Sequence, residues 1–569
     1  MVQLCHGMAE FVERYEEMIS RLCAEGISVC GIDMLGHGGT SKLNEDPLGY
    51  FGDVKNSYKN IFEDNKRFYE LVSARTQMAP SILFGHSMGS FVVRAMYSIP
   101  KYSNNYETFI FSSTKGNIDN LSHNESDYIF NLAQKVASYF KNSNKPVCIS
   151  NACISGVLAT VYAHRLLQQG KYKNIVVVGG DLLTDFVVSG FDSFRSLSHN
   201  VCKPYDKNRD GISLGEGAST LILSNETSIP NCYYIAGGAT SNDANHISGP
   251  SRTGEELAHA ITTAMEEAKV SATDVEFVNM HGTATVYNDE MESKALAVAG
   301  LTASTVVSEK GYFGHTLGCS GVLELALSIA LAEKKEIAQT IGFEETGTSV
   351  ELNVSKELIR NKNCDVFVKT GSGFGGCNAA VVISNRECED AKANDKSNYS
   401  QKCKITISND TCDTDFKTYI KGLFASVSEP YMKFSKMDDY CKLGTTAVEL
   451  LLHEAGGLSE YNPYEVALVV NTDTGCIESD LAHLGNITAD EYNSSPAIFV
   501  YTLPNVVAGE ICIKNKFKGE GVTLVGKAED PKKIVDEFCC DANTKVAIYL
   551  YVDKCGDSFS SEAILFERK

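Results

Sequence analysis

A cysteine at the end of a short apolar segment is the residue of this sequence best placed for nucleophilic chemistry. Residues 145–156, KPVCISNACISG, read as a short strand over Val147–Ile149, a turn of small residues and a helix with apolar side chains at helical spacing. Cys153 lies at the turn, where free N–H groups and the helix dipole favour the thiolate. A thiolate is the nucleophile of covalent acyl transfer. Because the chain has 19 cysteines, neighbouring motifs must decide whether Cys153 is more than a buried thiol.

Composition sets the class of protein in which such a site would operate. The chain has 569 residues, 43% of them hydrophobic, and a net charge of −21. This length predicts roughly three or four globular domains, and the negative charge argues against non-specific nucleic-acid binding. We find no C-x-x-C metal spacing, no signal peptide and no apolar run long enough for a membrane span. We therefore expect a cytoplasmic protein with reduced thiols.

The first hundred residues carry a different nucleophile signature. SILFGHSMGS places Ser87 in a G-x-S-x-G pattern between an apolar strand and a helix-like segment, the context of a nucleophile elbow. With LCHGMAEF and GIDMLGHGGTSK, residues 1–103 resemble α/β-hydrolases of the monoacylglycerol-lipase or lysophospholipase kind. The resemblance implies that Met8 and Met88 supply oxyanion N–H groups. A hydrolase acid and histidine lie well downstream of the serine, but another pattern begins soon after Ser87, so we expect a truncated or fused segment with a vestigial nucleophile.

From Tyr106 the pattern alternates strand and helix in two similar rounds. Apolar strands such as NIVVVGGD alternate with helical patterns such as YIFNLAQKVASYF. This alternation predicts a layered α/β fold, with a domain over 104–388 made of halves at about 104–228 and 229–388.

Five motifs in this domain carry a family resemblance. They are, in order, NACISG, RDGISLGEGA, NMHGTAT, EKGYFGHTLGCSG and GSGFGGCNAAVVI. In that order they resemble the β-ketoacyl-acyl-carrier-protein synthases, condensing enzymes with the thiolase fold. The resemblance implies that Cys153 is the acylated nucleophile, His281 and His315 are its histidine pair, Lys310 is their basic partner, and Phe374 is a gate. The backbone N–H groups of Cys153 and Phe374 would form the oxyanion hole.

Further implied roles surround these residues. Thr283 and Thr285 would contact the phosphopantetheine arm, and Asp289 and Glu292 would orient Lys310. The implied partner is acyl-carrier protein, which brings the substrates, and no metal or redox cofactor is implied. The family's first strand is expected in the centre of the first half's sheet, but hydrolase-like sequence takes its place here. We therefore expect unpaired ladder groups within that sheet.

The last third predicts another α/β module behind a polar linker. Residues 389–402 read as the linker and 403–569 as the module. The segment 494–517 is interpreted as a parallel of the Cys153 strand and helix, yet it has no cysteine where the nucleophile should fall, between Leu503 and Val506. The module resembles a degenerate N-terminal half of a second condensing enzyme, of the chain-length-factor type. We expect it to be non-catalytic and to pack against the middle domain as an internal partner, unless the chain forms a homodimer.

The resulting hypothesis is a 3-oxoacyl-[acyl-carrier-protein] synthase that extends a fatty acid or polyene chain. Two alternatives stay open. One is a serine hydrolase that acts on lipid esters through Ser87, and the other is a catalytically impaired partner subunit.

Overall fold

The computed structural model describes part of the chain, which divides into two compact units. One unit contains residues 1–106 and 216–220, and the other contains 107–215 and 221–569. The described residues are 2–5, 12–24, 28–31, 33, 65, 67–68, 70–72, 74, 82–85, 107–116, 118, 121, 129–140, 142, 144–226, 232–386, 398–412, 414–487, 494–527 and 529–569.

The first unit contains a small parallel sheet. Its strands are β1 (Val2–Cys5), β2 (Val29–Gly31) and β3 (Ile82–Gly85), in the order β2-β1-β3. Helix α1 (Glu16–Ala24) connects β1 to β2. Strand β3 is the strand predicted in front of Ser87, whereas Ser87, Met8 and Met88 lie outside the described residues.

The second unit begins with the half that carries Cys153. Its strands form one end of a nine-stranded sheet in the order β5-β4-β6-β7. Helix α6 (Ser155–Gln168) follows Cys153, so the predicted strand, turn and helix are confirmed. The strands are β4 (Thr108–Ser112), β5 (Val147–Ile149), β6 (Asn174–Asp181) and β7 (Gly217–Ser224), and the other helices are α5 (Ile129–Tyr139) and α7 (Asp185–Ser193).

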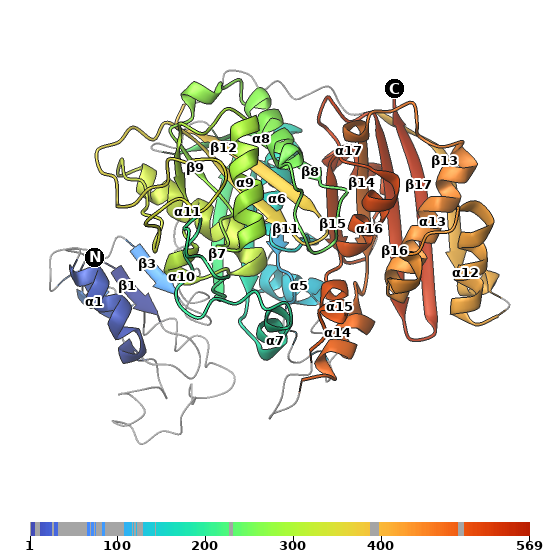
Figure 1. Ribbon diagram of the computed structural model, residues 1–569, viewed down its shortest axis with the longest axis horizontal. Helices are drawn as coiled ribbons and strands as arrows, with labels where there is room; N and C mark the ends of the chain where they lie inside the picture. Colours follow the sequence, from blue (N-terminus) through green and yellow to red (C-terminus); the bar gives the residue numbers. More distant parts are fainter. Residues whose placement is uncertain are drawn as a thin grey trace. The chain divides into compact units, whose positions relative to one another are not determined.

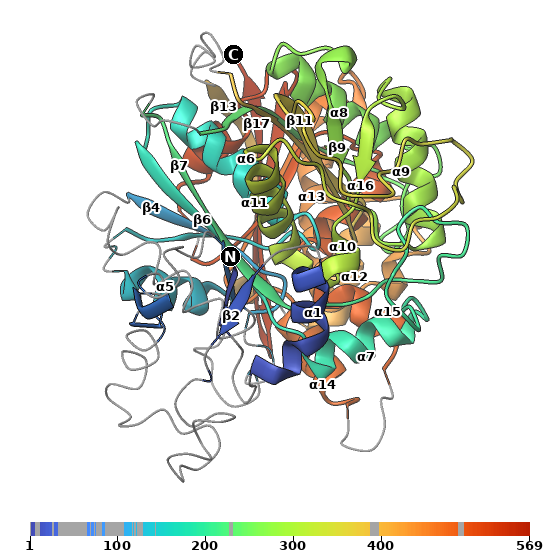
Figure 2. The ribbon, with the colours of Figure 1, turned by 90° about the vertical axis from the view of Figure 1, so that its left-hand side faces the viewer.

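The second half has a five-stranded sheet in the order β10-β9-β11-β12-β8. Helices α6 and α11 pack on each other and on both sheets, which makes them the central layer of an α/β sandwich (Figures 1 and 2). The strands are β8 (Tyr234–Asn242), β9 (Phe277–Asn279), β10 (Thr305–Val307), β11 (Val366–Gly373) and β12 (Cys377–Ser384); the helices are α8 (Glu255–Glu267), α9 (Val286–Val298), α10 (Lys310–Phe313) and α11 (Ser320–Ala332).

The third module repeats the strand order of the second half. Its strands follow the order β15-β14-β16-β17-β13, with the same parallel and antiparallel pairs as β10-β9-β11-β12-β8. Strand β13 begins inside the range predicted as linker. The strands are β13 (Tyr399–Ser408), β14 (Val466–Thr472), β15 (Gly521–Val525), β16 (Val546–Cys555) and β17 (Ser558–Arg568); the helices are α12 (Phe416–Val427), α13 (Asp439–Ala455), α14 (Ile477–Leu484), α15 (Pro496–Phe499), α16 (Val506–Asn515) and α17 (Pro531–Phe538).

These sheets correct the expected place of the missing first strand. In both complete sheets the first strand, β8 or β13, lies at the edge beside the fifth strand. Strand β4 pairs with β5 on one side and directly with β6 on the other. The missing strand therefore corresponds to an edge position beside β7, and the interior of the sheet keeps its hydrogen-bond ladder.

The third module joins the Cys153 half through the same sheet. Strand β15 runs antiparallel to β5 with Leu524 opposite Ile149, and Ser150 N donates to Thr523 O at 3.1 Å. In Figure 1 the module is drawn in orange and red, and β15 is its strand nearest the middle domain. The two modules therefore pack together within one chain, as the sequence predicted.

The structure corrects the interpretation of 494–517. This segment forms α15, a 3₁₀ turn (Val500–Thr502) and α16, with no strand, and it lies between the second and third strands of its sheet. Cys153 follows β5, and β5 occupies the sheet position that β15 occupies in the third module. The position that corresponds to Cys153 therefore follows β15. No cysteine occurs from 526 to 538 either. Pro496 at the start of a helix explains the error, because it favours a helical first turn over a strand ladder.

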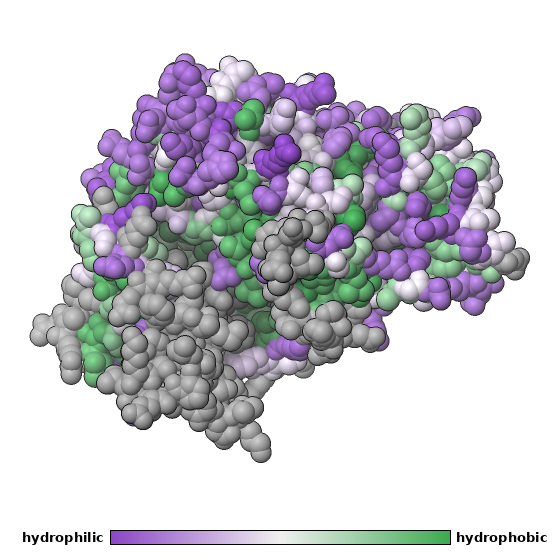
Figure 3. Space-filling view, turned by 60° about the horizontal axis from the view of Figure 1, so that its bottom comes forward, coloured by the Kyte–Doolittle hydropathy of each residue, from purple (hydrophilic) through white to green (hydrophobic). Residues whose placement is uncertain are grey.

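Helix hydropathy and surface hydropathy both bear on where the apolar residues lie. In the ranges that the structure describes, no single helix is long and apolar enough to cross a membrane, although the bent pair Pro496–Thr502 and Val506–Asn515 meets both criteria together. Hydrophilic residues dominate the outer edge of the face drawn in Figure 3, and hydrophobic residues gather further in.

Candidate active site

Cys153 is presented by a strained turn between β5 and α6. The residue before it, Ala152, has φ 47°, a left-handed conformation that reverses the chain sharply. Ser155 holds the turn, since its Oγ accepts from Asn151 N at 2.8 Å and donates to Ala152 O at 2.7 Å. The thiol is thereby fixed at the start of α6.

The backbone of each histidine is fixed by hydrogen bonds to other elements. His281 follows β9, and the carboxylate of Glu292 accepts the N–H groups of His281 at 2.9 Å and Gly282 at 2.8 Å. His315 bridges to the loop before β7, because its N donates to Ser213 O at 2.7 Å and its O accepts from Gly215 N at 3.0 Å. Both side chains therefore leave rigid backbone and are buried.

These three residues converge. The Sγ of Cys153 and one ring nitrogen from each histidine lie within 4.8 Å of one another. The two imidazole rings are 5.0 Å apart between centroids and nearly perpendicular, at 85°. Neither ring nitrogen of His315 has a hydrogen-bond partner among the described residues, although both are buried. A buried polar atom without a partner is costly, so this geometry fits a ring that receives its partner from a ligand.

The electrostatics correct one expectation about Cys153. Burial raises the pKa of its thiol to about 12, while the nearby charge of Lys310 opposes the rise. The helix N-terminus therefore does not produce a resting thiolate, because desolvation outweighs it. Burial also lowers the pKa of His281 and of His315 well below the usual value, and Lys310 and Lys369 lower both further. The site at rest thus holds a neutral thiol and two neutral imidazoles.

Lys310 has a partner that the motifs did not identify. Its Nζ donates to Glu324 Oε1 at 2.7 Å, and both side chains are fully buried. The other oxygen of Glu324 accepts from Lys369, which lies on β11. The described hydrogen bond of Lys310 therefore goes to Glu324 rather than to Asp289 or Glu292, while the charge of Lys310 lowers the pKa of Glu292 against the effect of burial.

Asp289 and Glu292 support the loops around the site instead. Asp289 accepts from Tyr205 N at 2.8 Å, and Glu292 accepts from the Tyr205 hydroxyl at 2.8 Å in addition to the His281 loop. Both carboxylates are buried within the first turns of α9. Asp289 and Glu292 follow HGTAT closely in sequence, so they lie against the loop that carries His281. Lys310 comes from a separate element, α10.

Phe374 lies next to the nucleophile turn. Its neighbour Gly373 packs so closely that an added Cβ would come within 3.2 Å of Cys153 N. The Phe374 ring packs against Phe191 and Phe194, with centroids 6.1 and 5.5 Å away. Its carbonyl accepts from Asn505 Nδ2 at 2.8 Å, a contact contributed by the third module.

Thr283 and Thr285 form one polar pair. Their Oγ1 atoms are 2.9 Å apart, and Ala284 between them has φ 61°, which turns both side chains to the same side of the loop. The structure therefore places these two hydroxyls in the loop that follows His281.

One thiol and two imidazoles are also a donor set that transition metals use. The ammonium groups of Lys310 and Lys369 act on both imidazoles, as their effect on the histidine pKa values shows. Positive charge at this position opposes a cation. The donor set therefore fits anionic intermediates better than a metal ion.

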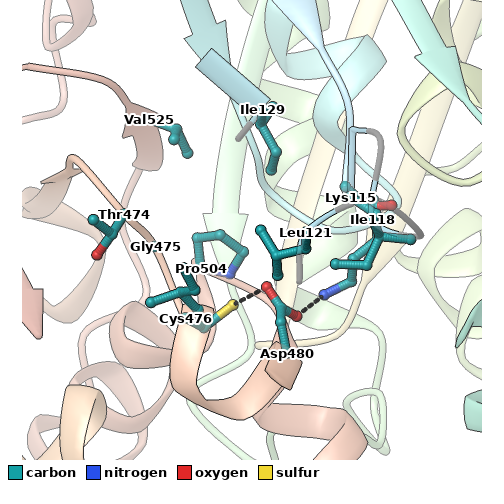
Figure 4. A pocket seen from close by; sticks show the side chains of 12 residues that line it. Lys115, Ile118, Leu121, Ile129, Thr474, Gly475, Cys476, Asp480, Pro504 and Val525 are labelled. Atoms are coloured by element: carbon teal, nitrogen blue, oxygen red, sulfur yellow. Dashed lines mark hydrogen bonds and ion pairs between the residues drawn. The ribbon is translucent and has the colours of Figure 1, made fainter. Parts of the chain in front are cut away.

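A pocket away from Cys153 lies where the middle domain meets the third module (Figure 4). Lys115 extends from one side and pairs with Asp480 at 2.9 Å, and Cys476 contacts the same carboxylate at 3.7 Å. Burial raises the pKa of Cys476 well above its usual value. These polar groups satisfy one another, so the pocket is a contact between modules.

Sequence reasoning missed Glu324, Lys369 and Asn505. Glu324 lies on the same side of α11 as the packed core and is an isolated acid among apolar residues, which is a usable signal. Lys369 is a basic residue directly after the apolar run Val366–Val368 of a buried strand, a comparable signal. Nothing local marks Asn505, because its role depends on how two modules pack.

Family models match two parts of the chain. Residues 1–196 match the model described as serine aminopeptidase, S33, and residues 233–344 match the β-ketoacyl synthase C-terminal domain. The first match extends past the predicted boundary at 103 and across the nucleophile turn of Cys153.

Curated relatives and a solved structure agree with the second match. The chain is 32% identical over 251 residues to the tetracenomycin polyketide synthase ketoacyl synthase alpha subunit of Streptomyces glaucescens, covering 42% of this chain and 59% of that protein. It is 30% identical over 250 residues to 3-oxoacyl-[acyl-carrier-protein] synthase 2 of Staphylococcus aureus, covering 42% and 60%. The chain therefore spans about three fifths of these relatives' length.

The fold extends further than the sequence likeness. The PfaC keto synthase–chain length factor structure aligns with a TM-score of 0.66 at 14% identity, covering 83% of this chain and 67% of that one. This likeness shows the fold. Together the matches confirm the thiolase-like fold and the resemblance to ketosynthases and, at the N-terminus, to α/β-hydrolases.

Proposed function

We propose that this chain is a 3-oxoacyl-[acyl-carrier-protein] synthase that uses Cys153, His281 and His315. The observation that carries the proposal is the approach of one sulfur and two ring nitrogens to within 4.8 Å of one another. Similarity to 3-oxoacyl synthases and polyketide ketosynthases supports it.

The first step is transfer of an acyl group to Cys153. The sulfur attacks the carbonyl of an acyl thioester on acyl-carrier protein, the new C–S bond replaces the old one, and the carrier thiol leaves with the proton. Because the resting thiol is protonated, an imidazole must accept its proton during attack. The backbone N–H groups near Cys153 and Phe374 would stabilise the oxyanion.

The second step is decarboxylative condensation. The malonyl group loses CO₂, and the electron pair of the broken C–C bond moves into the thioester as an enolate. Ring N–H groups of His281 and His315 would stabilise that oxygen. The enolate carbon then attacks the acyl carbon, the C–S bond to Cys153 breaks, and the released thiolate takes up a proton from solvent. No step requires a redox partner.

The test is product formation from acyl- and malonyl-carrier protein, followed by mass spectrometry. We expect a 3-oxoacyl product from the wild type and none from Cys153→Ala. Cys403→Ala, a matched change on β13, should leave the rate unchanged. We expect His315→Ala to retain acylation of Cys153 but to lose about 100–1,000-fold in condensation, because it removes one preorganised donor.

Two results would replace this proposal. Release of CO₂ without chain extension would identify an impaired partner subunit. The match over residues 1–196 favours a second candidate, a serine hydrolase. A fluorophosphonate probe that labels the wild type but not Ser87→Ala would establish that candidate, whereas we expect no labelling.

The third module is proposed as the internal partner of the catalytic domain. Its sheet continues from β5 to β15, and Asn505 reaches the carbonyl of Phe374. Acyl-carrier protein is the proposed external partner, because both substrates would arrive as its thioesters.

A further inference from the structure

Lys369 is a buried cation that the proposed chemistry does not yet use. It lies on β11 opposite Asn279 of β9 in the parallel ladder, and its side chain is 1% exposed. A lysine is rarely buried to this extent without a specific set of partners.

The partners of Lys369 lead directly to the site. Its Nζ donates to Glu324 Oε2, to Asn279 Oδ1 at 3.1 Å and to Met280 O at 3.4 Å. These three acceptors match the three donors of an ammonium group. Met280 immediately precedes His281.

The carboxylate of Glu324 is held between two lysines from different elements. One oxygen accepts from Lys310 at 2.7 Å and the other from Lys369. A continuous chain of contacts therefore runs from Lys310 through Glu324 and Lys369 to the peptide in front of His281. Each link is buried and charge-assisted or made to backbone, which gives the chain rigidity.

We propose that Lys369 is a positioning residue for the decarboxylation step, holding Glu324 and the Met280 carbonyl so that Lys310 and His281 keep a fixed separation while the enolate forms. This inference rests on the proposed function and assigns a role to a residue outside its motifs. Lys369 does not contact the reacting atoms.

The charge of Lys369 has a second effect on the same step. Lys310 on α10 and Lys369 on β11 act on both imidazoles. The Cys153 thiol lies beside the rings, and Glu292 on α9 holds the His281 backbone. Glu324 on α11 pairs with both lysines, and Glu309 interacts with Lys369. The two lysines favour neutral imidazoles. An imidazolium would stabilise the malonyl carboxylate as an ion pair and so resist loss of CO₂.

The test separates the two half-reactions in Lys369→Met, which keeps an unbranched side chain of nearly the same length without the charge. Release of CO₂ from malonyl-carrier protein and acylation of Cys153 are measured from pH 5 to pH 9. We expect decarboxylation to fall about tenfold or more, as for loss of a charge-assisted contact, while acylation changes by less than about threefold. The acid limb of the decarboxylation profile should move to higher pH, because the histidine pKa values rise toward their ordinary range.

Two variants make the result interpretable. Lys404→Met removes a lysine from an exposed pair in the third module and should match the wild type. Lys369→Arg retains the charge, so its acid limb should stay at the wild-type position even if the rate falls. This second variant serves the test if Lys369→Met does not fold.

Several outcomes would overturn the inference. Wild-type decarboxylation and an unmoved acid limb in Lys369→Met would do so. So would an equal loss of both half-reactions with a lower melting temperature and an unchanged pH profile, since that indicates a structural role alone. A shifted acid limb in Lys369→Arg would also contradict it. Absence of both half-reactions in the wild type would instead overturn the proposed function itself.

Discussion

Cys153 carries a protonated thiol in the resting protein. Burial raises its thiol pKa to about 12, so the thiolate fraction at neutral pH is very small. We expect site-specific alkylation by iodoacetamide to rise by about tenfold per pH unit from pH 7 to pH 10, because the rate follows the thiolate fraction. Mass spectrometry of the Cys153 peptide measures this rate.

The unfolded chain is the control for that experiment. In urea the same peptide should reach a plateau above about pH 9, as expected for an ordinary thiol. A plateau near that pH in the folded protein would contradict the raised pKa.

At the residue scale the motifs predicted positions better than they predicted charge states. The structure brings Cys153, His281 and His315 together as the motifs required. The dipole argument for a thiolate failed because helix N-termini act locally, whereas desolvation depends on the whole surrounding core. The motif around Lys310 likewise could not predict its partner, because Glu324 lies on the next helix, α11.

At the scale of elements, the close approach of α6 and α11 positions both halves of the site. At Gly156 an added Cβ would lie 2.7 Å from Val322 N and 2.9 Å from Gly318 O. These are backbone atoms that cannot yield easily, so Gly156→Ala must separate the helices. We expect it to lower the free energy of unfolding by about 1–3 kcal/mol, measured by urea denaturation, and to slow condensation.

Gly422 offers a matched control on α12, where an added Cβ meets nothing within 4 Å. Gly422→Ala should be neutral or stabilise by up to about 1 kcal/mol, through helix propensity. If the two variants are equally stable, the helices are not held by this contact.

Apolar periodicity predicts where strands occur but not the order of the strands in a sheet. The strands at Val147–Ile149 and Asn174–Asp181 could be predicted from apolar runs. Their neighbours in the sheet could not, because a run of apolar residues records burial but not which strand lies beside it. The missing first strand was therefore assigned to the centre, whereas direct pairing of β4 with β6 moves its position to an edge.

At the scale of the whole molecule, the third module contacts the loop of the proposed active site through Asn505. Its Nδ2 donates to Phe374 O at 2.8 Å, which ties the Phe374 loop to the third module. We expect Asn505→Ala to reduce condensation about fivefold to tenfold, the value of one hydrogen bond, with little change in the melting temperature. Steady-state rates with both carrier-protein substrates provide the measurement, and an unchanged rate would refute the contact's role.

A buried ion pair also joins the modules. The guanidinium of Arg165 on α6 pairs with Glu520, just before β15, and both side chains are almost fully buried. Glu520→Gln should lower the free energy of unfolding by about 3 kcal/mol, because it removes the hydrogen-bonded counter-charge of a buried cation. Glu562→Gln, in the exposed pair with Lys404, should cost less than about 1 kcal/mol. Equal effects in urea denaturation would contradict this account of the interface.

The single sheet that runs from β5 into β15 has a consequence for how the protein behaves at low abundance. Two separate subunits must find each other, and dilution drives them apart. Here covalent connection keeps the local concentration of the second module high and constant. If the third module is the internal partner proposed above, specific activity should therefore stay level from micromolar to picomolar protein.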